Sequence, residues 1–211
     1  MTRKRSLVRR SAAVAAAGAA ALVLAACGGD GDGSAGHGDH NAPASASASA
    51  SASASQGQHN AADVAFAKGM IPHHRQAVEM ADLAPDRARS AEVRKLAADI
   101  KKAQGPEITT LSGWLTSWGE EVPAEGAMDH AMHDMGGMMT AEEMSRLKDA
   151  SGKAFDTAFM EMMIEHHEGA VEMAKTEQSD GAHGPAKKMA GEIITSQSAE
   201  IEQMNQLLGK D

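Results

Sequence analysis

A long internal repeat is the feature that most limits what this chain can fold into. Residues 66–84 read FAKGMIPHHRQAVEMADLA, and residues 159–177, 93 positions later, read FMEMMIEHHEGAVEMAKTE. Ten of these nineteen positions are identical, and the same offset continues without a gap as far as Leu115 and Leu208. Such a repeat predicts two copies of one structural unit, which pack together to bury a shared core.

The N-terminal segment has the features of an export signal. Basic residues in the first ten positions precede an uncharged, alanine-rich stretch that is too short for a spanning helix. The stretch ends in Leu-Ala-Ala-Cys, which is similar to the lipobox of bacterial lipoproteins. We therefore expect residues 1–26 to be removed and a lipid on Cys27 to anchor an exported protein to the outer face of the cell membrane. An ordinary signal peptide with an incidental cysteine is the alternative.

Removal of the signal would make the mature chain strongly acidic. The full chain has 20 basic and 29 acidic residues, and five of the basic ones lie in residues 1–26. The mature net charge is then −14, from 15 basic and 29 acidic side chains. This charge repels nucleic acid and attracts cations. Because Cys27 is the only cysteine, stability must come from a packed core and not from disulfides.

The rest of the chain divides into a tether and one helical domain. Residues 27–61 are rich in Ala, Ser and Gly and predict a flexible tether. Residues 62–211 have the length of a single domain. Strand patterns are nearly absent there, and helical periodicity marks four segments, at about 66–84, 90–118, 153–178 and 184–208.

Short loops within each pair of segments predict two antiparallel hairpins, 62–118 and 153–211, joined by a connection over 119–152. A capping box from Thr140 to Glu143 predicts a short extra helix in that connection. The chain is therefore expected to form an all-α, four-helix bundle with a pseudo-twofold axis.

Each copy of the repeat carries an adjacent histidine pair on the apolar side of its helix. Burial of four imidazoles is unfavourable unless each one finds a hydrogen bond or a metal. Methionines share the same side, whereas Gln76 and Glu79 fall on the opposite, solvent-facing side. Methionine is also a common core filler, and buried histidines are often just hydrogen-bonded. We favour a metal site made by His73, His74, His166, His167, Met70, Met80, Met163 and Met173.

The connection between the hairpins contains a second group of soft ligands. Residues 128–139 read MDHAMHDMGGMM, and a solvated loop gains nothing from so many oxidisable thioethers. Thioether sulfur suits Cu(I), and imidazole suits copper in either oxidation state. The alternative is an adaptable surface that docks a partner protein. The candidate ligands here are Met128, His130, Met132, His133, Met135, Met138 and Met139.

Polar residues also fall on the apolar side of the second and fourth helices. They are Gln104 and Glu107 in one hairpin and Gln197 and Glu200 in the other. A core-facing glutamate needs a partner, and the histidines are the obvious candidates. The glutamates would either accept hydrogen bonds that fix the imidazole tautomers or bind the metal directly. Extension to the rim of the bundle is the alternative.

The element M-I-x-H-H-x-x-A-V-x-M-A, present at Met70–Ala81 and Met163–Ala174, resembles the CopM-like family of exported, His- and Met-rich proteins, a domain family of unknown function numbered 305. Phe155-Asp156, followed by Phe159, adds to the resemblance. The resemblance implies a ferritin-like helical bundle, export and, for some members, binding of copper or silver that supports tolerance.

Together these features predict a membrane-tethered protein that binds copper, Cu(I) in preference, with Ag(I) as a mimic, for sequestration or transfer. It would act without catalysis, with metal ions and a copper-delivery protein as its partners. Two alternatives remain open at this stage. One is a metal-dependent redox enzyme that uses the histidine pairs with Glu107 and Glu200, and the other is an interaction module of the cell envelope. The sequence indicates no oligomeric state.

Overall fold

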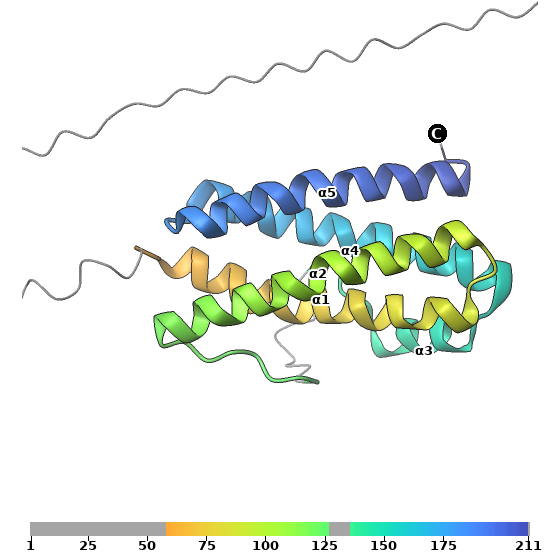
Figure 1. Ribbon diagram of the computed structural model, residues 1–211, viewed down its shortest axis with the longest axis horizontal. Coiled ribbons are helices and arrows are strands. Elements are labelled where there is room, and N and C mark those ends of the chain that lie inside the picture. The colour runs from red at the N-terminus through yellow and green to blue at the C-terminus, as the bar shows by residue number, and fades with distance from the viewer. Residues whose placement is uncertain (1–57, 127–135, 211) are drawn as a thin grey trace, which may run out of the picture. The chain divides into compact units, whose positions relative to one another are not determined.

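A computed structural model describes residues 58–126 and 136–210, and the part it describes is helical, as predicted (Figure 1). Five helices follow one another without a strand in these ranges: α1 (Ala61–Arg87), α2 (Ala91–Trp118), α3 (Ala141–Asp149), α4 (Gly152–Asp180) and α5 (Gly184–Leu208). None of them has an apolar stretch of the length needed to span a bilayer. The leader with Cys27, the tether up to residue 57, and Met128, His130, Met132, His133 and Met135 lie outside the described residues.

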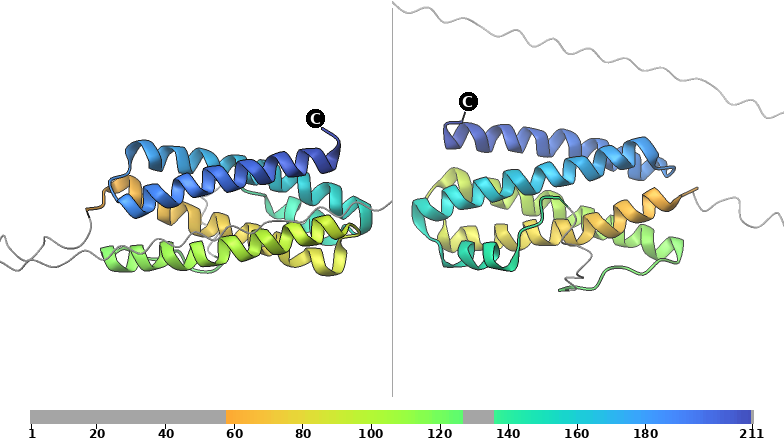
Figure 2. Two further views of the ribbon diagram at one scale, coloured as in Figure 1. Left: turned by 45° about the horizontal axis from the view of Figure 1, so that its top comes forward. Right: turned by 180° about the vertical axis from the view of Figure 1, so that it is seen from behind.

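The four long helices form two hairpins that meet along one seam. α1 packs against α2, α4 packs against α5, and the hairpins contact each other through α1 and α4 (Figures 1 and 2). The short α3 lies over α1 and α4. This arrangement confirms the predicted all-α bundle of two hairpins.

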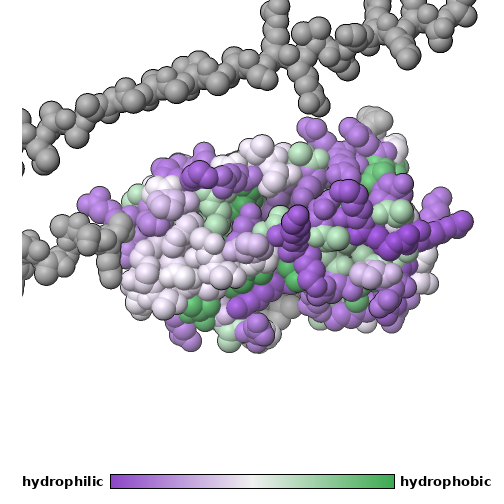
Figure 3. Space-filling view, viewed as in Figure 1, coloured by the Kyte–Doolittle hydropathy of each residue, from purple (hydrophilic) through white to green (hydrophobic). Residues whose placement is uncertain are grey.

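The helices bury their apolar sides in a core made of two hydrophobic clusters. Its largest fully buried side chains come from all five helices and include Phe155, Phe159, Ile100, Leu147 and Met204. Leu207 is the one large hydrophobic side chain that is exposed in the described part. Figure 3 accordingly shows only small, separate hydrophobic areas on the face in view.

One helix end follows the signal in the sequence and another does not. Thr140 and Glu143 form the predicted capping box at the start of α3. The end of α1 was predicted near Ala84 because Pro85 follows, but the helix continues to Arg87. A proline in the last turn removes only one backbone hydrogen bond, and the Ala88 N–H still donates to the Ala84 carbonyl at 2.9 Å.

Two buried aspartates tie each hairpin to the turn of the other. Asp156, at the start of α4, accepts hydrogen bonds from the backbone N–H groups of Arg89 and Ser90, both at 3.0 Å. Its repeat equivalent, Asp63 in α1, accepts in the same way from Ala182 at 3.1 Å and from His183 at 2.8 Å. The start of α1 therefore lies beside the α4–α5 turn, so α1 and α4 run antiparallel. We call Asp63 and Asp156 the reciprocal aspartates.

Glu177 lies next to Asp63 and has an unusual pKa. Its side chain is buried, and its two carboxylate oxygens have no donor among the described residues. Burial, followed by the neighbouring Asp63, raises the pKa of Glu177 to about 8, although Lys187 opposes the shift. Burial alone would also raise the pKa of Asp63, but the N–H groups of His183, Asn60 and Ala182 outweigh it and lower that pKa. As an acid, Glu177 can donate its proton to Asp63.

We expect this carboxyl to make the stability of the fold fall with rising pH. In the unfolded chain Glu177 loses its proton near pH 4.5, whereas the folded chain holds it up to about pH 8. Between these values only the folded state binds this proton, so the contribution of Glu177 to stability decreases as the pH rises, whereas the lowered pKa values of His73 and His166 contribute in the opposite direction up to about pH 6.5 in both proteins. Glu177→Gln cannot ionise and can still donate to Asp63, so it should remove this slope. Urea unfolding of both proteins between about pH 5 and pH 8 measures the difference, and equal slopes would contradict the assignment.

Candidate metal centre

The four histidines of the repeat lie in the middle of α1 and α4, where the two hairpins meet. All four are completely buried. The rings of His73 and His166 contact each other, with centroids 3.7 Å apart and planes inclined by 45°. These two residues are equivalent in the repeat, so their contact lies on the pseudo-twofold axis of the bundle. The fold thus joins the two sequence motifs into one site.

The other histidine of each pair faces a glutamate on the partner helix of its own hairpin. His74 Nε2 lies 2.6 Å from Glu107 Oε2, and His167 Nε2 lies 2.7 Å from Glu200 Oε2. The carboxylate can only accept, so Nε2 of each imidazole carries a proton, and in the neutral tautomer the lone pair is on Nδ1. Both Nδ1 atoms are buried, and no donor in the described part of the chain reaches them.

Further buried polar atoms of the four long helices also lack hydrogen-bond partners among the described residues. Within the described ranges, neither ring nitrogen of His73 or His166 is hydrogen-bonded. The same holds for both amide atoms of Gln104 and for Oε1 of its repeat equivalent Gln197. An unpaired buried polar group costs about 1–3 kcal/mol, so a concentration of them at a symmetric position needs an explanation. A bound ion supplies one.

Their electrostatic surroundings keep the imidazoles of His73 and His166 neutral. We call these two residues the axial pair, because their rings meet on the pseudo-twofold axis. Burial, then the neighbouring His74, lowers the pKa of His73 to about 3, with a further contribution from His167, and the nearby backbone of Gly136 opposes this shift weakly. Burial, then His73, His167 and His74, lowers the pKa of His166 well below its ordinary value. All four histidines therefore act on one another as a single cluster. A neutral imidazole is the form that binds a metal.

The methionines of the repeat are placed less symmetrically than the histidines. Met70, Met80 and Met163 are fully buried. Met173, the repeat equivalent of Met80, was expected on the same apolar side but is only half-buried and lines a surface groove. The difference arises because Met80 belongs to the core cluster that Met144 and Leu147 of α3 complete. Met173 has no such cover from the described residues.

A short segment, Gly136–Met139, crosses the seam between α1 and α4. The Gln76 side chain donates to the Met139 carbonyl at 2.8 Å and accepts from the Met139 N–H at 2.7 Å. On α4, the repeat equivalent of Gln76 is Gly169, which lies so close to Gly136 that a Cβ there would sit 1.9 Å from the Gly136 carbonyl oxygen. The two residues that the segment contacts, Gln76 and Gly169, each follow a histidine of the axial pair by three positions, which is about one helical turn. The segment therefore covers His73 and His166. Met139 is buried and Met138 half-buried.

The expectation that Gln76 faces solvent was therefore wrong. Helical periodicity assigns it to the outer side of its own helix, but Gly136–Met139 covers that position, and Gln76 is only 3% exposed. Glu79 does face solvent, as expected, in an ion pair with Lys148 of α3.

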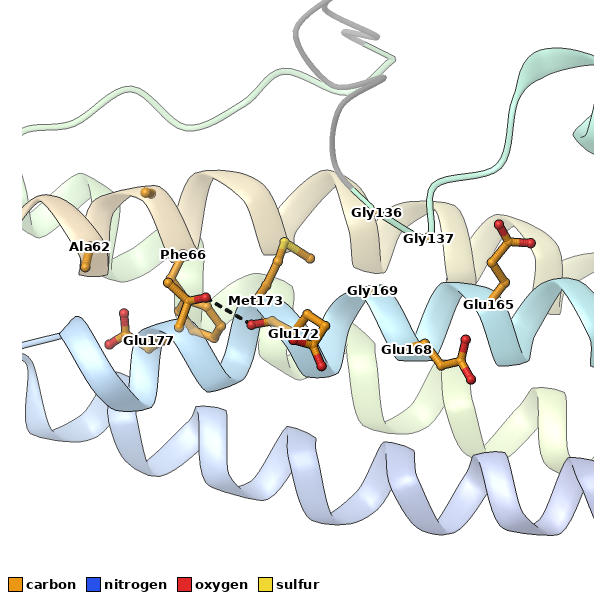
Figure 4. A pocket seen from close by; sticks show the side chains of 12 residues that line it. Ala62, Phe66, Gly136, Gly137, Glu165, Glu168, Gly169, Glu172, Met173 and Glu177 are labelled. Carbon is orange, nitrogen blue, oxygen red and sulfur yellow. Dashed lines mark hydrogen bonds between the residues drawn. The ribbon is translucent and has the colours of Figure 1, made fainter.

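An acidic groove of about 630 Å³ runs along α4 beside this crossing (Figure 4). Glu165, Glu168 and Glu172 line it on one side of α4, together with the half-buried Met173. Figure 4 shows Gly136 and Gly137 close to Gly169 at this groove. In residues 58–126 and 136–210, no three His, Cys, Asp or Glu side chains are grouped so as to hold a metal ion by themselves.

These features define a class of protein, a duplicated helical hairpin with paired histidines on its internal axis. The chain belongs to the DUF305 family, a domain family of unknown function, whose model matches residues 63–208. No curated protein matches it.

Solved structures of family members have the same fold. A DUF305 protein from Streptomyces coelicolor is 37% identical, with a TM-score of 0.64, over 71% of this chain and 91% of its own. CopM in its Cu(I)-bound form is 36% identical, with a TM-score of 0.57, over 69% of this chain and 94% of its own. A DUF305 fragment from Deinococcus radiodurans is 29% identical, with a TM-score of 0.64, over 72% and 98%. CopM has also been solved in Cu(II)-bound, Ag-bound and apo forms.

Proposed function

We propose that this protein binds copper at the centre formed by His73, His74, His166 and His167. The observation that carries the proposal is the group of buried imidazole nitrogens without hydrogen-bond partners on the pseudo-twofold axis. Their low pKa leaves the axial lone pairs free of protons at neutral pH. CopM, which shares the fold and about a third of the sequence, binds Cu(I), Cu(II) and Ag, and this likeness supports copper as the metal.

The outer histidines are suited to act as ligands because of their glutamates. Glu107 and Glu200 would hold the protons of His74 and His167 on Nε2 and direct each Nδ1 lone pair into the core. A carboxylate in this position also raises the basicity of the imidazole. The fully buried Met70, Met80 and Met163 would add soft sulfur, which favours Cu(I) and Ag(I) over harder ions.

The rest of the chain fits a role in the cell envelope. We propose that Cys27 carries a lipid and that residues 27–61 tether the bundle to the outer face of the membrane. The Met/His connection, including Met138 and Met139, would then collect copper or pass it to and from a delivery protein. Storage or transfer of this kind protects the cell by keeping copper bound. The redox-enzyme alternative lacks comparable support, because the four histidines are buried away from the groove that could admit a substrate.

A competition titration tests the metal preference. The mature domain, residues 27–211, is titrated with Cu(I) against a chromogenic Cu(I) chelator, and in parallel with Zn(II) against a zinc chelator. We expect Cu(I) to bind at least about 100-fold more tightly than Zn(II), a difference of roughly 2.7 kcal/mol. Equal or tighter binding of Zn(II) would overturn the proposed soft-metal centre.

A further inference from the structure

A second group of imidazole side chains lies at the end of the bundle, away from the four histidines of the repeat. His59 stacks on Trp118, with ring centroids 4.6 Å apart and an interplanar angle of 9°. His183 meets the same indole edge-on at 5.2 Å and also meets Trp114 edge-on at 5.3 Å. We call these four residues the tryptophan–histidine cluster. Two imidazoles from segments far apart in the chain therefore contact one indole.

The cluster has an unsatisfied ligand atom. His183 Nε2 is buried and finds no hydrogen-bond partner in the described residues. His183 is the N-cap residue of α5, but its side chain makes no capping hydrogen bond, so the helix does not explain its placement. His59 is exposed, and a surface hollow of about 540 Å³ beside it is also lined by Val64, Lys68 and Glu120. An ion can thus reach the cluster from solvent without passing through the core.

The composition of the cluster favours one class of ion. The starts of α1 and α5, which carry partial positive charge, meet the ends of α2 and α4, which carry partial negative charge. The helix dipoles therefore largely offset one another here. Lys68 is paired with Glu120 at 2.5 Å and adds little net charge. The Asp63 carboxylate next to His183 already accepts hydrogen bonds from the backbone N–H groups of Asn60, Ala182 and His183. The groups left to hold an ion are therefore soft: imidazole nitrogens and the faces of two indoles, which attract cations through their π electrons.

We propose that the tryptophan–histidine cluster is a second binding site for a soft monovalent cation, Cu(I) or Ag(I), with His59 and His183 as its nitrogen ligands and Trp118 in contact with the ion. This site is separate from the histidine centre. His73 lies twelve residues after Ala61, the first residue of α1, which is about 18 Å along a helix that rises 1.5 Å per residue. The two sites can therefore be occupied and tested independently.

The chain provides its own reporter for this site. It contains two tryptophans in total, Trp114 and Trp118, and both belong to the cluster. Ag(I) absorbs no tryptophan emission, so it quenches only by contact, and an ion at the histidine centre is too far away to do so. The experiment is a titration of residues 27–211 with Ag(I), followed by tryptophan fluorescence.

We expect saturable quenching in the wild type and in a His73→Leu/His166→Leu variant, in which the proposed main centre is removed. A His59→Phe/His183→Phe variant keeps the ring contacts but loses both nitrogens, so it should need roughly tenfold more Ag(I) for the same quenching. Its unfolding midpoint without metal serves as the folding control. No quenching in the wild type, or the same titration in the phenylalanine variant, would overturn this site and leave the histidine centre unaffected. Equal quenching by Zn(II) would overturn its assignment to soft cations.

Discussion

Replacement of His73 and His166 by leucine should abolish the stabilisation of the fold by copper while leaving the metal-free fold as stable as before or more so. Both side chains are buried, and their ring nitrogens make no hydrogen bond within the described residues. Removal of unpaired polar groups from a core is neutral or favourable when the new side chain has a similar volume. In the wild type, Cu(I) at 100 times its dissociation constant should add about 2.7 kcal/mol, because it binds only the folded state.

For a domain of this size that gain corresponds to a rise of roughly 5–10 °C in the melting temperature. The measurement is thermal unfolding of both proteins with and without Cu(I) under reducing conditions. A His74→Leu/His167→Leu variant is the matched comparison. It leaves Glu107 and Glu200 without their partners and should lose about 1–3 kcal/mol per site even without metal. A His73→Leu/His166→Leu variant that copper still stabilises would show that the axial pair is not the metal site.

Removal of both reciprocal aspartates should unfold the bundle at ordinary temperature. Asp156 accepts two backbone hydrogen bonds, and Asp63 accepts from Asn60, Ala182 and His183. Hydrogen bonds to a charged group contribute about 1.5–3 kcal/mol each, so either change to alanine should cost at least about 3 kcal/mol. The two residues lie at opposite ends of the bundle, where effects add. The combined loss approaches the total stability of a typical domain, about 5–15 kcal/mol.

Urea unfolding of Asp63→Ala, Asp156→Ala and the double variant measures these losses. Asp99→Ala is the matched control, because Asp99 is exposed and, among the described residues, is paired only with Lys95, and this change should alter stability by less than about 1 kcal/mol. Asp156→Asn keeps one acceptor oxygen and should fall between the wild type and the alanine variant. If the alanine variants were as stable as Asp99→Ala, the aspartates would not hold the hairpins together.

Most of the fold could be predicted from periodicity because each helix buries a wide apolar side, and the repeat then determined how the hairpins pair. The contact between His73 and His166 was beyond this reasoning. Both residues of each pair lie on the apolar side, and only the rotation of α1 against α4 decides which one reaches the axis. Gln76 was misplaced, and Met173, which packs against the core but is only half-buried, was expected to be more buried, for a related reason. A helical projection treats every helix alike and ignores the segment that covers one of them.

The reciprocal aspartates could have been found. Asp63 and Asp156 each precede a matched phenylalanine, Phe66 and Phe159, by three positions, so they extend the repeat upstream. Acidic residues are common in the first turn of a helix, where they stabilise the N–H groups of that same helix. Their position therefore gives no reason to expect hydrogen bonds from these aspartates to a distant turn. Gly169 differs from its repeat equivalent, Gln76. The mismatch marks a position where the two halves contact the Gly136–Met139 segment differently, Gln76 through hydrogen bonds and Gly169 through close backbone approach.

The duplication also affects how the site behaves on dilution. If each hairpin were a separate chain, His73 and His166 would meet only where the protein was concentrated enough to dimerise. Joined in one polypeptide, the two halves experience an effective concentration in the millimolar range, which follows from the length of the connection and not from expression level. A single molecule therefore carries the complete pair of His73 and His166.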